Sequence, residues 1–125
     1  MKNLFFLALA GSMGAITRHL LFLLFAKITY IKFPLGTMFV NVLGSFLIGV
    51  AYVYISSKPH LSETLKLIIV IGFLGSFTTF STFTYDRIQL FNRGSLIYPS
   101  VYIFLSIFLS LIAFVIGIKI IQYFI

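Results

Sequence analysis

Three long uncharged runs constrain what this chain can fold into. They cover residues 33–55, 67–85 and 95–118. Each run reaches the roughly 17–25 residues that an α-helix needs to cross a bilayer. Because hydrocarbon offers no hydrogen-bond partners to loose backbone groups, such runs must be helical wherever they meet lipid. We therefore expect an all-α membrane protein.

A fourth span precedes these runs and is less uniform. Residues 3–17 and 20–26 are largely apolar, but Arg18 and His19 interrupt them. We interpret residues 3–26 as one helix whose arginine snorkels, pairs or lines water. A signal peptide is the rival interpretation, since Lys2 precedes the apolar run, but the pattern resumes beyond Arg18. With approximate spans at 3–26, 33–56, 63–90 and 95–123, we predict a single four-helix transmembrane domain over residues 1–125.

Composition excludes several function classes. The chain has no cysteine, so it has no thiol nucleophile, disulfide or thiolate metal site. It matches no nucleophile–histidine–acid set, metal-ligand spacing or phosphate-binding loop, so we do not expect an enzyme. The net charge is +7. We assign that charge to lysines and arginines beside anionic lipid head groups, and we expect no nucleic-acid partner.

Basic residues are divided almost evenly between the two ends of the four spans. One end carries Lys2, Lys58, Lys66 and Lys119; the other carries Lys27, Lys32, Arg87 and Arg93, with Arg18 inside the first span and nearer this second end. The positive-inside rule needs an asymmetry to choose an orientation. The balance favours insertion in both orientations and assembly into antiparallel pairs. One orientation chosen by other features is the alternative that the charges leave open.

The third span contains a polar run at membrane depth. Residues 72–83 read Gly-Phe-Leu-Gly-Ser-Phe-Thr-Thr-Phe-Ser-Thr-Phe, with two glycines and five hydroxyl side chains. Such a run must face protein or a watery cavity. A helix break near residues 75–79 would free carbonyl oxygens that can hold a cation. Phe80 and Phe83 share a helical face and have electropositive ring edges, so together with the hydroxyls they indicate a path for a small anion.

Polar side chains also lie in the second and fourth spans. Asn41 is costly in a membrane without a partner, and it acts either as a link between helices or as a donor of two N–H groups to an anion. Tyr102, Ser106 and Ser110 are four residues apart and line one helix face, which predicts a polar track. Four helices are too few to enclose a wide pore, so we expect the path at a subunit interface.

Three motifs occur in order on the first three spans. Residues 11–18 fit G-x-x-G-A-x-x-R, residues 36–49 fit G-T-x-x-V-N-x-x-G-S-F-x-x-G, and residues 72–83 fit G-f-x-G-g-x-T-T-F-S-T-F. The visible departure is Ser76, where glycine is common. With these motifs, nearly the whole chain resembles the CrcB/Fluc family of small fluoride channels.

This resemblance implies an antiparallel, dual-topology homodimer with two fluoride pores built from both subunits. It implies that the pores are lined by Asn41, Phe80, Phe83, Tyr102, Ser106 and Ser110, to which we add the hydroxyls of Ser81 and Thr82. Backbone carbonyls of Gly75 and Thr78 are implied to hold a central sodium ion (Na+) at the dimer interface. Arg18 is expected in a vestibule or an ion pair.

The expected function is passive, selective export of cytoplasmic fluoride through a multi-pass protein of the prokaryotic plasma (inner) membrane. A proton-coupled exporter of organic cations is one alternative, but it needs an acid within the membrane, and we expect Glu63 and Asp86 at segment ends. A non-transporting assembly protein is another, and it predicts that Asn41, Phe80 and Phe83 tolerate substitution.

Overall fold

Four helical segments of this chain are long and apolar enough to cross a membrane. The computed structural model describes residues 2–29, 33–58 and 63–125. The segments are α1 (Lys2–Ile28), α2 (Leu35–Ser56), a compound third span (Glu63–Phe91) and α6 (Ile97–Phe124). The prediction of an all-α, multi-pass membrane protein is thus confirmed. The ends of these segments differ from the predicted spans by at most two residues.

The third span is a composite of four pieces. It begins with α3 (Glu63–Lys66) and continues through a π-helix, η1 (Leu67–Leu74), into α4 (Gly75–Phe77). It resumes as α5 (Phe80–Phe91). Thr78 (φ −78°, ψ 157°) and Thr79 (φ −151°, ψ 124°) between them are extended. The predicted break in the third helix is therefore confirmed, and the extended residues are Thr78 and Thr79.

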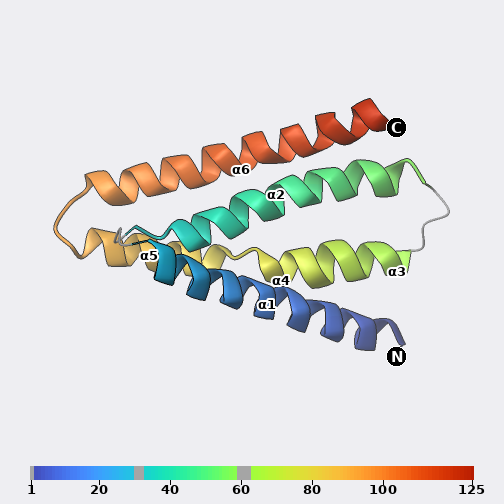
Figure 1. Cartoon of the computed structure of the whole chain (residues 1–125), viewed down its shortest axis with the longest axis horizontal. Helices are drawn as coiled ribbons and strands as arrows, with labels where there is room; N and C mark the ends of the chain where they lie inside the picture. Colours follow the sequence, from blue (N-terminus) through green and yellow to red (C-terminus); the bar gives the residue numbers. More distant parts are fainter. Residues whose placement is uncertain (1, 30–32, 59–62) are drawn as a thin grey trace.

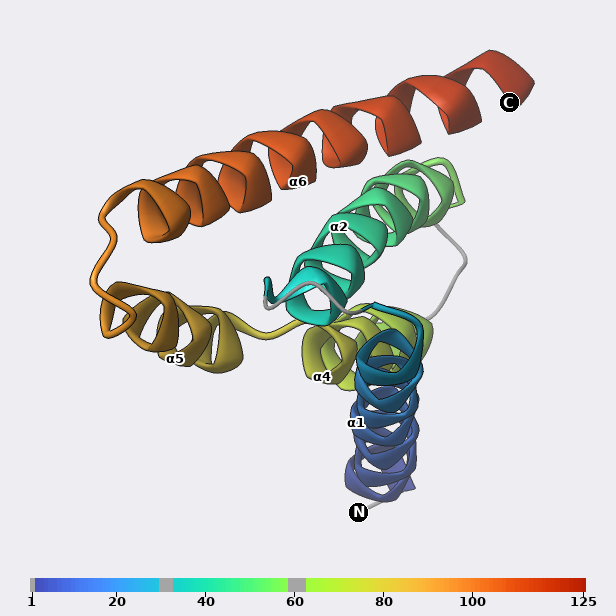
Figure 2. The same cartoon turned by 60° about the vertical axis from the view of Figure 1, so that its left-hand side comes forward.

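The third span packs against different helices before and after its break. Both chain termini lie at the same end of the molecule (Figure 1). α2 packs along α6, whereas α1 packs along η1 and α4 (Figure 2). Beyond the break, α5 packs against α6 and α2. The break thus carries the third span from the α1 side of the molecule to the α6 side.

Glycines allow α2 and α6 to approach closely. A Cβ added at Gly49 would overlap the Phe114 carbonyl oxygen, and one at Gly117 would overlap the Phe46 carbonyl oxygen. Each glycine therefore leaves room for a backbone carbonyl of the opposite helix. Small residues at such contacts are the usual means of tight packing between membrane helices.

Candidate functional site

The helix break is bridged by the side chain of Asn41. Its Nδ2 donates to the Thr79 carbonyl oxygen at 2.9 Å, and its Oδ1 accepts from the Thr79 N–H at 2.8 Å. The amide thus satisfies both backbone groups of the residue that the break removes from the helix. Thr79 is buried, so each of these groups would be costly without a partner. Asn41 therefore links two helices, as one of its two predicted roles required. The bond to Thr79 uses one of the two hydrogens on Nδ2.

The break diverts the usual helical donors of the Gly75 and Thr78 carbonyls. In an uninterrupted α-helix, Thr79 N would donate to Gly75 O and Thr82 N to Thr78 O. Here Thr79 N donates to Asn41, and Thr82 N donates to Thr79 Oγ1 at 3.2 Å. Arg18 Nη1 donates instead to the Thr78 carbonyl at 3.2 Å. Arg18 is therefore part of the break, and its place in a vestibule or an ion pair stays a prediction.

A cavity of about 460 Å³ lies between α2, the break, α5 and α6. The predicted site residues on its wall are Asn41, Thr78, Phe80, Phe83, Ser106 and Ser110. The Phe80 and Phe83 rings are 5.6 Å apart between centroids, but Phe80 is 77% exposed and Phe83 only 8%. Phe83 is therefore packed inside the chain, whereas Phe80 projects from it.

The three hydroxyls of α6 occupy different environments. Ser106 and Ser110 line the cavity, and Ser106 Oγ is buried with no hydrogen bond of ordinary length and angle to another described residue. A membrane serine normally bonds back to its own helix, so this hydroxyl remains available to a ligand. Tyr102 is fully buried and lies outside the cavity wall; its ring is 5.1 Å from Phe83.

Ser81 and Thr82 lie in the first turn of α5. Both hydroxyls are within hydrogen-bonding distance of Thr79 Oγ1, at 3.1 and 3.2 Å. Neither residue is on the cavity wall. They stabilise the break, since the Thr79 hydroxyl also accepts from Thr82 N and caps α5.

Asp86 departs from its expected place at a segment end. It lies within α5 and is half-buried; Thr37 Oγ1 donates to its Oδ2 at 2.6 Å, and the Tyr102 hydroxyl donates to the same atom at 3.4 Å. Thr37 and Asp86 also border a second cavity, of about 240 Å³. Sequence reasoning missed both residues, although a lone acid continuing the polar run of the third span was a usable signal.

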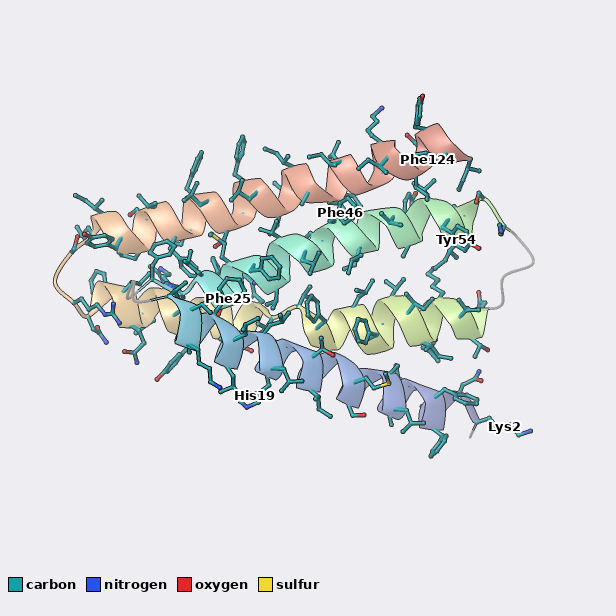
Figure 3. The ribbon with its side chains drawn as sticks, viewed as in Figure 1. Lys2, His19, Phe25, Phe46, Tyr54 and Phe124 are labelled. Carbon is teal, nitrogen blue, oxygen red and sulfur yellow. The ribbon has the colours of Figure 1, made fainter. Side chains whose placement is uncertain are left out.

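Metal-binding side chains do not gather in the described ranges. They contain no group of three His, Cys, Asp or Glu placed to hold a metal ion. His19 is exposed and points to the outer side of α1, away from the other helices (Figure 3).

Comparison with known proteins agrees with the three motifs. Residues 5–118 match the family described as CrcB-like protein, Camphor Resistance (CrcB). A relative from Hahella chejuensis (strain KCTC 2396), named fluoride-specific ion channel FluC, is 41% identical over 93% of this chain and 91% of its own length. Another of that name, from Shewanella baltica (strain OS185), is 40% identical over 94% of each chain. The chain therefore belongs to the CrcB/FluC family, a family of fluoride ion channels and not of enzymes.

Proposed function

We propose that this protein is a passive, fluoride-selective channel that exports cytoplasmic fluoride. The observation that carries the proposal is the cavity beside the helix break, where amide, hydroxyl and aromatic groups meet on otherwise apolar walls. The relatives named fluoride-specific ion channels supply the identity of the ion.

The chemistry of the cavity wall suits a small, strongly hydrated anion. Such an ion enters only where hydrogen-bond donors and positive ring edges replace its water. Ser106 Oγ lies buried at the wall with no hydrogen bond of ordinary geometry to the rest of the described chain, and Asn41 keeps a second N–H hydrogen. Phe80 and Phe83 contribute ring edges. Larger halides are then rejected by the width of the path.

A second, antiparallel copy completes the path in this proposal. Phe80 is 77% exposed, Gly75 is also exposed, and the cavity opens at its side. A chain that conducted alone would leave its phenylalanine and its cavity facing lipid. The balanced charges of the two ends fit a partner of opposite orientation, and a two-fold pair contains two equivalent pores.

Sodium fits the carbonyls proposed to hold it. Gly75 O and Thr78 O are both acceptors whose helical donors are diverted at the break. Two copies would together offer four carbonyl oxygens, which are ligands suited to a hard cation. When bound, the ion supplies positive charge that favours anions nearby. Arg18 donates to the same Thr78 carbonyl and adds a fixed positive charge there.

Passive flow fits a site that contains no nucleotide-binding motif. The half-buried Asp86 is the one described acid that a proton-coupled exporter could use. The hydroxyls of Thr37 and Tyr102 both donate hydrogen bonds to its carboxylate. Fluoride would therefore leave down its electrochemical gradient across the prokaryotic plasma membrane, which would protect intracellular enzymes.

Anion efflux from liposomes tests this function. Purified protein is reconstituted with internal fluoride or chloride, and a potassium ionophore collapses the voltage. We expect rapid loss of fluoride and retention of chloride, with no need for a pH gradient. Retention of both anions by folded dimers would overturn the proposal. Fluoride loss that requires a pH gradient would favour the coupled exporter.

A further inference from the structure

The ring of Phe33 packs against the ring of Tyr102. Their centroids are 5.6 Å apart and the rings are nearly perpendicular, at 87°. Phe83 contacts the same tyrosine ring at 5.1 Å, and Tyr102 retains no exposed surface. Tyr102 is thus enclosed between one ring from α5 and one ring from the segment that precedes α2.

A tight turn holds Phe33 in this position. Leu35 N donates to the Phe33 carbonyl at 2.8 Å, and Pro34 between them has φ −78° and ψ 63°. These are the angles of an inverse γ-turn, a three-residue turn often found where a regular segment begins. Because Pro34 fixes φ, the turn presets the direction from which Phe33 approaches. Phe33 itself lies outside α2, so its ring can move without unwinding a helix.

Phe33 contacts Tyr102 and lines the smaller of the two cavities described above. It borders the smaller cavity together with Thr37 and Asp86. The larger cavity is lined by Phe83, whose ring also contacts Tyr102, and by Ser106, which lies four residues after Tyr102 on α6. The Tyr102 hydroxyl reaches toward Asp86 at 3.4 Å, on the side of the smaller cavity. An ion that follows the α6 hydroxyls past Ser106 therefore meets Tyr102 and then the ring of Phe33.

We propose that Phe33 controls passage between the two cavities, and that the γ-turn at Pro34 positions it. This inference rests on the proposed channel function. In the structure the ring closes the Tyr102 end of the track, so passage requires that the ring turn away from Tyr102. Removing the ring removes that contact, and loosening the turn makes the displacement easier.

Single-channel recording in planar bilayers tests the role of Phe33. We expect Phe33→Ala to raise the unitary fluoride current about two- to tenfold, the range implied by the loss of one edge-to-face ring contact. Pro34→Ala keeps the ring but frees the turn, so its current should rise less. Phe25→Ala is the matched control, because Phe25 borders the same cavity but packs on Phe39, with centroids 5.1 Å apart. Its current should stay within twofold of the unmodified protein.

A second measurement does not depend on how the alanine variant packs. The chain has no cysteine, so Phe33→Cys introduces a single thiol. A water-soluble, negatively charged thiol reagent should modify it and reduce the fluoride current, while the cysteine-free protein remains unaffected. A modified thiol with unchanged current would overturn the inference, as would an unchanged or smaller current in Phe33→Ala. If the unmodified protein itself carried no fluoride current, the proposed function would fail as well.

Discussion

Replacing Asn41 by aspartate separates the two tasks of this side chain. The carboxylate can still accept from Thr79 N–H, at the position where Oδ1 now accepts at 2.8 Å. It has no hydrogen to donate to the Thr79 carbonyl, which receives Nδ2 at 2.9 Å. The buried Thr79 carbonyl therefore loses its partner. Its oxygen, which carries a partial negative charge, then faces an oxygen of the charged carboxylate.

The expected magnitudes differ for stability and for conduction. An unsatisfied buried carbonyl costs about 1–3 kcal/mol, so Asn41→Asp should destabilise the fold by about that amount. A negative charge about 4 Å from a passing anion costs about 4 kcal/mol at an effective dielectric constant of about 20. Allowing for screening by water in the open cavity, we expect fluoride efflux to fall at least about tenfold.

Asn41→Leu provides the complementary perturbation. Leucine has a similar volume but no polar atoms, so both Thr79 groups lose their partner and the destabilisation should be about twice as large. Liposome efflux per folded protein and unfolding in a denaturing detergent would be measured for both variants. Asn3→Asp, at the exposed start of α1, makes the same chemical change away from the site and should behave as the unmodified protein. Unchanged efflux and unchanged stability in Asn41→Asp would refute the reasoning.

Further substitutions test other parts of the structure. Phe80→Ile and Phe83→Ile should each reduce fluoride efflux strongly without changing the elution of the protein on size-exclusion chromatography; efflux at the unmodified rate in both would contradict a pore role for these rings. Ser106→Ala should lower efflux less than Asn41→Asp does, because water or a neighbouring hydroxyl can replace one donor, and an equal or larger loss would contradict this. Arg18→Gln should destabilise the fold by about 1.5–3 kcal/mol, the value of a charged hydrogen bond, whereas the exposed Arg87→Gln should not. Gly49→Ala should destabilise by about 1–3 kcal/mol through overlap with the Phe114 carbonyl, as measured by detergent unfolding. Gly11→Ala should cost less, since its new Cβ meets only the Ser76 hydroxyl closely, at 3.2 Å; equal costs would refute the packing argument.

Much of the architecture was predictable because bilayer thickness and backbone hydrogen bonding limit the alternatives. Uncharged runs located the spans, and the density of hydroxyl residues indicated the break in the third. The sequence pattern suggested a window of 75–79 for the break, whereas the extended residues are Thr78 and Thr79. That detail depends on Asn41, which lies far away in the sequence and captures the backbone of Thr79.

Side-chain partners were harder to predict than helices. The periodicity of α6 grouped Tyr102 with Ser106 and Ser110, but Tyr102 is fully enclosed while both serines line the cavity. Tyr102 is enclosed because it contacts Phe33, Phe83 and Asp86, which come from other segments. A helical repeat specifies which residues share a face, whereas the neighbours of each depend on contacts between segments distant in sequence.

The helix break has a consequence for the order in which the chain matures. Its backbone groups are satisfied by Arg18 of α1 and Asn41 of α2, both of which precede Thr78 and Thr79 in the sequence. During synthesis the N-terminal segments emerge first. Both partners therefore leave the ribosome before the break does. When the third span enters the bilayer, the side chains that bond its backbone are already present. A chain with its first two helices moved to the C-terminus would contain the same contacts but would have to insert an interrupted helix without them.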